Sequence, residues 1–156
     1  MNTIKRHRRL DPVPRHGGGF TLIEVLVALS IVAILAALAL PSFQQQIRQA
    51  RRADGQTALM KLAIAQEKFR ANCSSYAVGI DGTRRCDPVS ASTNRLGLSA
   101  LSQDGHYALR LSEVDASGFL AHAEPLGDQT RDQARGVPCH PLTIDQDGQR
   151  EPRECW

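Results

Sequence analysis

The chain has 156 residues, of which 42% are hydrophobic and 22% are charged. If the first 40 or so form a leader and a membrane segment, about 115 remain to fold, which is enough for one small domain and excludes two large ones. The net charge is +3, from 19 basic and 16 acidic residues, but residues 1–19 hold five of the basic residues and one acidic residue. The remainder therefore has 14 basic and 15 acidic residues, and the overall charge gives no argument for nucleic-acid binding.

Residues 20–40 form an apolar run with a single charged residue, Glu24. A helix of this length measures roughly 30 Å, which is the hydrocarbon thickness of a bilayer. The basic residues before the run outnumber Arg48, Arg51 and Arg52 after it, so the positive-inside bias places the N-terminus in the cytoplasm and the rest outside. An unpaired carboxylate in hydrocarbon costs roughly 2.5–3.5 kcal/mol, so Glu24 requires a partner or a function.

Two ordinary interpretations of this segment leave Glu24 unexplained. One is a permanent signal anchor, and the other is a secretory signal peptide cut at the small-residue triplet Ala37-Leu38-Ala39. The apolar run is longer than the core of about 7–15 residues that is usual in a signal peptide. The signal-peptide interpretation predicts that residues 1–39 are removed.

The N-terminal motif supports a third interpretation. Gly19-Phe20-Thr21-Leu22-Ile23-Glu24, with basic residues before it and an apolar run and Pro41 after it, resembles the N-terminus of type IV pilins and pseudopilins. The resemblance implies that residues 1–19 are a leader, that a prepilin peptidase cuts after Gly19, and that Phe20 becomes the N-methylated first residue. It also implies that Glu24 meets the terminal amine of a neighbouring subunit and sets the axial register of a filament.

The helix is expected to continue past Pro41, which lacks an amide proton and should kink or weaken it there. In Ser42–Ala71, apolar residues at spacings of four, three and four predict an amphipathic helix that packs on a sheet. These are Ala58, Leu62, Ala65 and Phe69. Gly55 should weaken the helix locally. The basic residues expected to face solvent or neighbouring subunits are Arg51, Arg52, Lys61 and Lys68.

The four cysteines are too far apart for a Cys-x-x-Cys motif, and their even number indicates disulfides in an oxidising compartment. They are Cys73, Cys86, Cys139 and Cys155, and they allow three connectivities.

The second half of the chain is predicted to form a loop followed by strands. Residues 72–95 predict a connecting loop, and the stretches 106–111, 119–123 and 141–144 predict strands. A long helix followed by strands indicates an α+β head with an antiparallel meander.

Further motifs resemble minor pilins of type IV pili: Arg51 to Asp54, Tyr107 to Leu109, Leu142 to Gly148, and Cys155-Trp156. The resemblance implies the type IV pilin fold, in which a long helix, half transmembrane and half amphipathic, packs on a small antiparallel sheet. The expected divisions are a leader at 1–19, a membrane helix at 20–41 and a head at 42–156. In pilins a disulfide near the C-terminus closes the head, which would pair Cys139 with Cys155 and leave Cys73 with Cys86.

The function that the resemblance implies is that of a structural subunit of a type IV pilus, which serves pilus biogenesis, adhesion, twitching motility or DNA uptake. The implied location is the inner membrane, with a single pass and a cytoplasmic N-terminus, and then the extracellular pilus. The implied partners are other pilins in a helical filament, prepilin peptidase, an inner-membrane assembly platform, and extracellular DNA or a host surface. The alternatives are a DNA-binding competence pilin and a pseudopilin of a type II secretion system.

The sequence predicts no metal, cofactor or catalytic site. Five residues fall at the ligand and turn positions of an EF-hand calcium loop: Thr143, Asp145, Asp147, Gly148 and Glu154. A hairpin that turns at Asp147-Gly148 accounts for the same residues. His122 and the Cys139-His140 pair lack the spacing of zinc ligands. The chain has no nucleophile elbow, phosphate loop or paired-carboxylate motif, so we do not expect an enzyme.

Arginines in the loops of the head are candidate DNA ligands. If Arg84, Arg85, Arg131 and Arg135 converge on one face, they could contact phosphates. Arg95, Arg150 and Arg153 are distributed among the same loops. Acidic residues between them favour an ordinary mixed surface, among them Asp128, Asp132 and Glu151.

Overall fold

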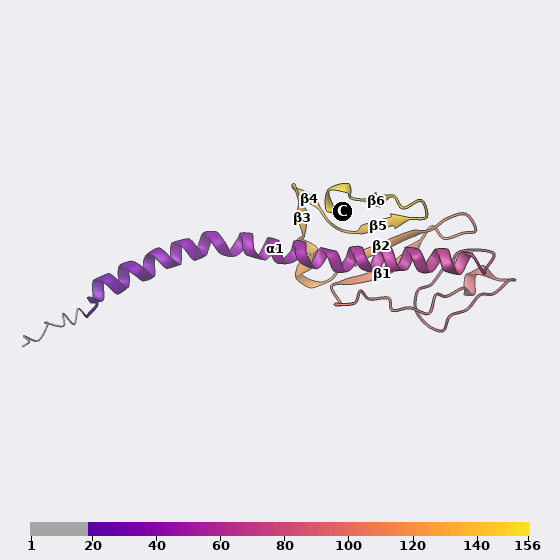
Figure 1. The fold of residues 1–156 in the computed structure, drawn as a ribbon, viewed down its shortest axis with the longest axis horizontal. Coiled ribbons are helices and arrows are strands. Elements are labelled where there is room, and N and C mark those ends of the chain that lie inside the picture. The colour runs from indigo at the N-terminus through magenta and orange to yellow at the C-terminus, as the bar shows by residue number, and fades with distance from the viewer. Residues whose placement is uncertain (1–18) are drawn as a thin grey trace, which may run out of the picture. The chain divides into compact units, whose positions relative to one another are not determined.

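The computed structural model describes residues 19–156 and divides the chain into two units, with the boundary between Leu38 and Ala39 (Figure 1). The basic residues of the predicted leader lie outside the described residues. Helix α1 (Leu22–Arg70) contains Pro41 in its interior and continues past it. The predicted kink at Pro41 stays a prediction.

The first part of α1 is long and apolar enough to cross a membrane, with a mean hydropathy of 2.8 over its most apolar window. Its large apolar side chains are exposed, and Val25 and Val27, the least exposed of those between Phe20 and Leu40, are at 47%. A helix with apolar residues on all sides needs a lipid or protein environment that this unit does not supply. The apolar N-terminal helix predicted from the sequence is confirmed.

The head, Ala39–Trp156, has a four-stranded antiparallel sheet in the order β1-β2-β5-β6. The strands are β1 (Tyr107–Ser112), β2 (Leu120–Pro125), β5 (Leu142–Asp145) and β6 (Arg150–Glu151). Figure 1 shows the second half of α1 lying along the sheet. This arrangement confirms the α+β prediction, and β1, β2 and β5 are the three predicted strands.

The core lies between α1 and the sheet. Leu59, Leu62 and Phe69 from α1 are buried with Tyr107 and Leu142 from the strands. Three of the four residues in the predicted apolar stripe are buried, and Ala65 is partly exposed. The 3.6-residue periodicity therefore identified the face of α1 that packs on the sheet.

Two hairpins complete the head. The hairpin of β3 (Gln133–Ala134) and β4 (Val137–Pro138) turns at Arg135 and Gly136, with φ values of 51° and 83°. Positive φ at both central residues is what a two-residue type I′ turn requires. The β5–β6 hairpin turns at the predicted Asp147-Gly148, where Gly148 has a φ of 77°.

The predicted connecting loop, residues 72–95, is part of a longer loop between α1 and β1, residues 71–106, that contains a short 3₁₀ helix, η1 (Ala91–Thr93). The structure pairs Cys73 with Cys86 in this loop. It pairs Cys139 with Cys155 beyond the sheet, where η3 (Arg153–Cys155) ends the chain. These are the two pairings that the pilin resemblance implies.

Gly55 has a packing role that its helix propensity does not reveal. A Cβ atom built at Gly55 would lie 2.9 Å from two carbons of the Tyr107 ring, and Tyr107 is fully buried. The ring is also held by its hydroxyl, which accepts a hydrogen bond of 3.0 Å from Gln129 Nε2. Gly55 therefore permits close contact between α1 and β1.

Gly55→Ala should destabilise the head by about 1–3 kcal/mol through overpacking, although Gly to Ala in a helix interior usually stabilises by about 1 kcal/mol. Chemical unfolding of the full chain in detergent measures this change. Ala53→Gly on the exposed side of the same helix is the control and should cost only the propensity difference. An increase in stability for Gly55→Ala would contradict the close packing of this glycine on Tyr107.

Candidate functional site

The N-terminal motif begins helix α1. The Thr21 hydroxyl accepts a hydrogen bond of 3.3 Å from the backbone N–H of Glu24. Thr-x-x-Glu is the sequence of a capping box, and a carboxylate in the first turn also interacts favourably with the helix dipole. The Thr21 hydroxyl therefore caps the start of the helix, and the Glu24 carboxylate lies in its first turn, a motif that was readable in the sequence but was missed there.

The four arginines proposed as DNA ligands do not converge on one face. Arg84 lies above Phe69, near the end of α1, with its guanidinium carbon 5.9 Å from the ring centroid. Arg131 and Arg135 lie close in sequence to Asp132. Asp132 pairs with Arg52, which comes much earlier on α1 than Phe69 does. Positions 52 and 69 are roughly 25 Å apart along a helix. The structure therefore divides the predicted set into two separate surfaces.

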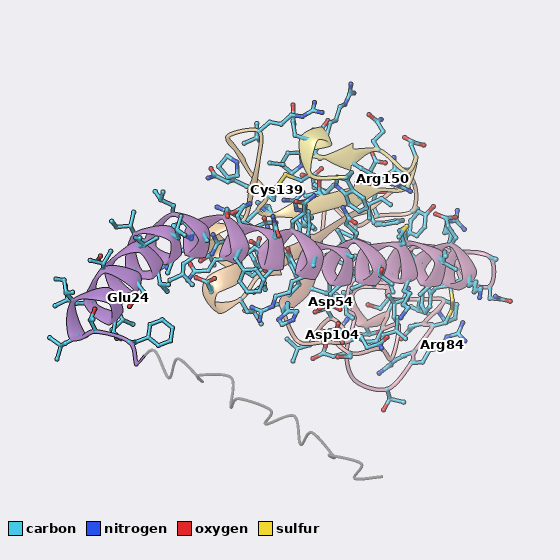
Figure 2. The ribbon with its side chains drawn as sticks, turned by 60° about the vertical axis from the view of Figure 1, so that its left-hand side comes forward. Glu24, Asp54, Arg84, Asp104, Cys139 and Arg150 are labelled. Carbon is cyan, nitrogen blue, oxygen red and sulfur yellow. A yellow bond between two sulfur atoms is a disulfide. The ribbon has the colours of Figure 1, made fainter. Side chains whose placement is uncertain are left out.

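The first surface is on the connecting loop, and we call Arg84, Arg85 and Arg95 the loop arginines. Arg85 and Arg95 pair as an antiparallel bridge with two backbone hydrogen bonds of 3.0 Å each. Arg84 is next to this bridge and is exposed, as Figure 2 shows. The backbone pairing thus brings Arg95, which is ten positions away in sequence, beside the two predicted arginines.

A network around Asp87 and a disulfide hold this loop in place. The Asp87 carboxylate accepts hydrogen bonds from the backbone N–H groups of Val89 and Ser90 and from the Thr93 hydroxyl. These bonds, those from Val89 and Ser90 first, lower the pKa of Asp87. Arg85 also pairs with Asp87, at 3.1 Å. Within residues 19–156, Arg84 and Arg95 are in no ion pair.

The second surface lies around the C-terminus, and more of its arginines are paired with carboxylates. Arg131 pairs with Asp128 at 3.3 Å, and Arg153 pairs with Glu151 at 3.4 Å. Arg135 is exposed at the β3–β4 turn. The Arg150 guanidinium carbon lies 5.0 Å from the Trp156 ring centroid, a cation–π contact. Glu151 is exposed as well, so this surface has little net positive charge.

Two charged residues that we expected at the surface are buried. Arg52 is 7% exposed and Asp132 is 1% exposed, and Arg52 donates two hydrogen bonds to Asp132, of 2.7 and 2.9 Å. The bond to Asp132 raises the pKa of Arg52. The expectation that Arg52 faces solvent, and the use of Asp132 as a surface charge, were therefore wrong. A bidentate pair can be buried because each charge satisfies the other.

His122 is on the outer face of the sheet and is mostly buried. Its Nε2 is 2.6 Å from the Ser112 hydroxyl, while Nδ1 has no hydrogen-bond partner. Burial and then the nearby Arg110 lower the pKa of His122, and Glu124 and Glu113 oppose this shift. The residues described contain no cluster of three or more metal-ligating side chains.

Because the pKa of His122 is lowered on folding, the unfolded chain binds more protons below pH about 6.5. The head should therefore lose stability as the pH falls below about 6.5, and His122→Gln should make this loss smaller. Unfolding curves at pH 7.5 and 5.5 measure the difference, with His140→Gln, an exposed histidine, as the control. An unchanged pH dependence in His122→Gln would contradict this assignment.

Together, the capped apolar helix and the disulfide-closed α+β head define a protein of the type IV pilin class. The chain belongs to the family described as "Type IV minor pilin ComP, DNA uptake sequence receptor", whose model matches residues 41–143. The model of the prokaryotic N-terminal methylation motif matches residues 15–40. The chain is therefore a member of the type IV minor pilin family.

Relatives of the chain are also pilins. It is 36% identical over 134 residues to the type IV major pilin PilA of Myxococcus xanthus, which covers 86% of this chain and 51% of that protein. It is 28% identical to a probable minor fimbrial protein of Dichelobacter nodosus, over 72% of this chain and 65% of that one. The chain spans about half the length of the first curated relatives it matches.

A solved structure of a type IV pilin from Shewanella oneidensis is similar, with a TM-score of 0.43 and 24% identity. The match covers 70% of this chain and 97% of that one.

Proposed function

We propose that the chain is made as a prepilin in the inner membrane, with its N-terminus in the cytoplasm, and is processed before it enters the pilus. A prepilin peptidase would cut after Gly19 and methylate Phe20. The match to the N-terminal methylation motif over residues 15–40 supports this proposal. The inner-membrane assembly platform would then insert the subunit, with Pro41 allowing the helix to kink.

In the assembled filament, Glu24 would pair with the Phe20 amine of a neighbouring subunit. Phe20 lies just before α1 and Glu24 lies in its first turn, so each subunit carries both charges at the same end of the helix. A pair in a low-dielectric core offsets part of the cost of burying each charge and fixes the register between subunits.

Mass spectrometry of the protein from native membranes tests the processing step. A chain that starts at methylated Phe20 supports it. A chain that starts at Leu40 would mean a cleaved signal peptide and would remove the helix that holds Glu24.

We further propose that the head binds DNA through the loop arginines Arg84, Arg85 and Arg95. The observation that carries this proposal is the backbone pairing of Arg85 with Arg95, with Arg84 next to it in the chain, in a family described as a receptor for DNA uptake sequences. Only Arg85 of the three is in an ion pair within the described residues. The second surface is less suited to phosphate because carboxylates already pair with Arg131 and Arg153.

The expected contribution of the loop arginines is electrostatic. Three phosphate contacts would give a slope of about −2.7 in a plot of log affinity against log salt, which corresponds to about 40-fold weaker binding between 50 and 200 mM salt. Replacing all three with alanine should lower affinity and reduce the magnitude of the slope by about 3.

The test is a titration of full-length protein in detergent with fluorescent duplex DNA at several salt concentrations. The matched control is Arg131→Ala with Arg135→Ala, which removes arginines from the second surface. Loss of affinity in the loop variant alone supports the proposal. Loss only in the control variant would place the site on the second surface, and no binding by the unaltered protein would remove DNA binding from the function.

A further inference from the structure

Val89 lies in the connecting loop, and its side chain is 95% exposed. Among residues 19–156 no other large apolar side chain is as exposed, and even in the apolar segment of α1 the highest value is 85%, at Leu22. An exposed apolar side chain loses hydration free energy that contact with a partner would recover. The position of Val89 beside the loop arginines indicates which partner that is.

Two features of the backbone hold Val89 outward. Oδ1 of Asp87 accepts a hydrogen bond of 2.9 Å from the backbone N–H of Val89 and one of 3.1 Å from that of Ser90. Pro88, between Asp87 and Val89, has its φ fixed at about −65° by its ring. The side chain is therefore presented in one place, and a partner does not have to order the turn when it binds.

Asp87 also brings Val89 next to the loop arginines. Arg85 donates a hydrogen bond of 3.1 Å to Oδ2 of the same carboxylate, so Arg85 and Val89 are joined through one side chain. Arg95 donates a hydrogen bond of 3.2 Å to the backbone carbonyl of Ser92, three positions after Val89. The exposed valine therefore lies among the cations that would hold phosphates.

The chemistry of this loop limits what it could read on DNA. The Asp87 carboxylate accepts four hydrogen bonds from its own loop, which is its full capacity, so it is not available to the amino group of cytosine. Val89 is followed by Ser90, Ala91 and Ser92, whose short side chains leave it room to enter a groove. The apolar group that base edges present in the major groove is the C5-methyl of thymine.

We propose that Val89 is a specificity-determining residue of the DNA site and packs on the C5-methyl group of a thymine in the major groove. The loop arginines hold the phosphates on either side of that base. The inference rests on the DNA binding proposed above and goes beyond it, because phosphate contacts alone carry no sequence information.

The test compares two fluorescent duplexes in titrations of the full-length protein in detergent. One has alternating adenine and thymine, and the other has uracil in place of every thymine. The two duplexes therefore differ only in the C5-methyl groups, wherever along the duplex the protein binds. We expect the unaltered protein to bind the thymine duplex about fourfold more tightly, which is the effect of one buried methyl group.

Variants identify the side chain that reads the methyl group. Val89→Ala should bring the affinity ratio of the two duplexes close to one and leave the salt dependence unchanged, while Val89→Ile should keep the ratio. Leu126→Ala is the matched control, because Leu126 is an exposed apolar residue outside this loop, and it should also keep the ratio. Unfolding curves of each variant report whether the head is intact.

The outcomes separate this inference from the DNA-binding proposal. Salt-dependent binding of the unaltered protein to both duplexes with a ratio of one or less would overturn the role of Val89 and leave DNA binding in place. A ratio that Val89→Ala leaves unchanged, or that Leu126→Ala removes equally, would also overturn that role. No binding to either duplex would remove both the DNA-binding function and this inference.

Discussion

Asp132→Ala is expected to lower the free energy of unfolding of the head by about 3–5 kcal/mol, because it leaves the Arg52 guanidinium buried without its counter-charge. Arg52 is 7% exposed and gives two hydrogen bonds to this carboxylate. Its remaining bond, of 3.3 Å to the backbone carbonyl of Gln133, cannot compensate for the lost charge.

Chemical unfolding of the full chain in detergent measures this effect. Glu124→Ala is the matched control, because the Arg110–Glu124 pair is solvent-exposed and such pairs contribute about 1 kcal/mol or less. Equal losses in the two variants would show that the Arg52–Asp132 pair behaves as a surface pair. Arg52→Met with Asp132→Leu should recover much of the stability, since it removes both charges together.

Replacing Cys139 and Cys155 with serine should cost about 2–5 kcal/mol. Both cysteines are buried in the main core, at 0% and 1% exposure, and the bond closes the last part of the chain onto the sheet. The double variant also places two hydroxyls in an apolar site, which adds to the loss. The measurement is again the unfolding free energy, taken under non-reducing conditions.

The matched control replaces Cys73 and Cys86 with serine. That loop is similar in length, with a sequence separation of 13 against 16, so the entropic contributions should be similar. Cys86 is exposed, and the stability loss should therefore be smaller. DNA affinity should instead fall, because this disulfide anchors the segment that carries the loop arginines. The reverse pattern would contradict the separate roles given to the two disulfides.

Regular elements were predictable where their pattern was long enough to read. The alternation in residues 106–111 identified β1, and the stripe that contains Leu62 and Phe69 identified the buried face of α1. Strands β3, β4 and β6 have two residues each, which is too short to show a period of two. The turn at Arg135-Gly136 was missed because its first position is an arginine rather than the usual asparagine or aspartate.

The candidate sites were less predictable, because they depend on which distant residues meet. The sequence suggested Arg84 and Arg85 but could not show that Arg95 pairs beside them or that Arg131 lies elsewhere. Arg52 and Asp132 were assigned to the surface because charged residues are rarely buried unless they are paired. The two residues are 80 positions apart in the sequence, so their pairing could not be read there. The contacts of Asp54 with Ser102 and Asp104 depend on the path of the segment before β1, which shows no periodicity.

The buried Arg52–Asp132 pair also has a mechanical consequence. Neither disulfide joins α1 to the sheet. Polar attachments between α1 and the rest of the head are instead distributed along the helix, at Arg52 to Asp132, Gln56 to the Cys155 carbonyl and Gln66 to the Ala77 carbonyl. In a filament under tension, a pull along α1 would load these attachments in parallel, as shear, so that the head resists until several of them fail together.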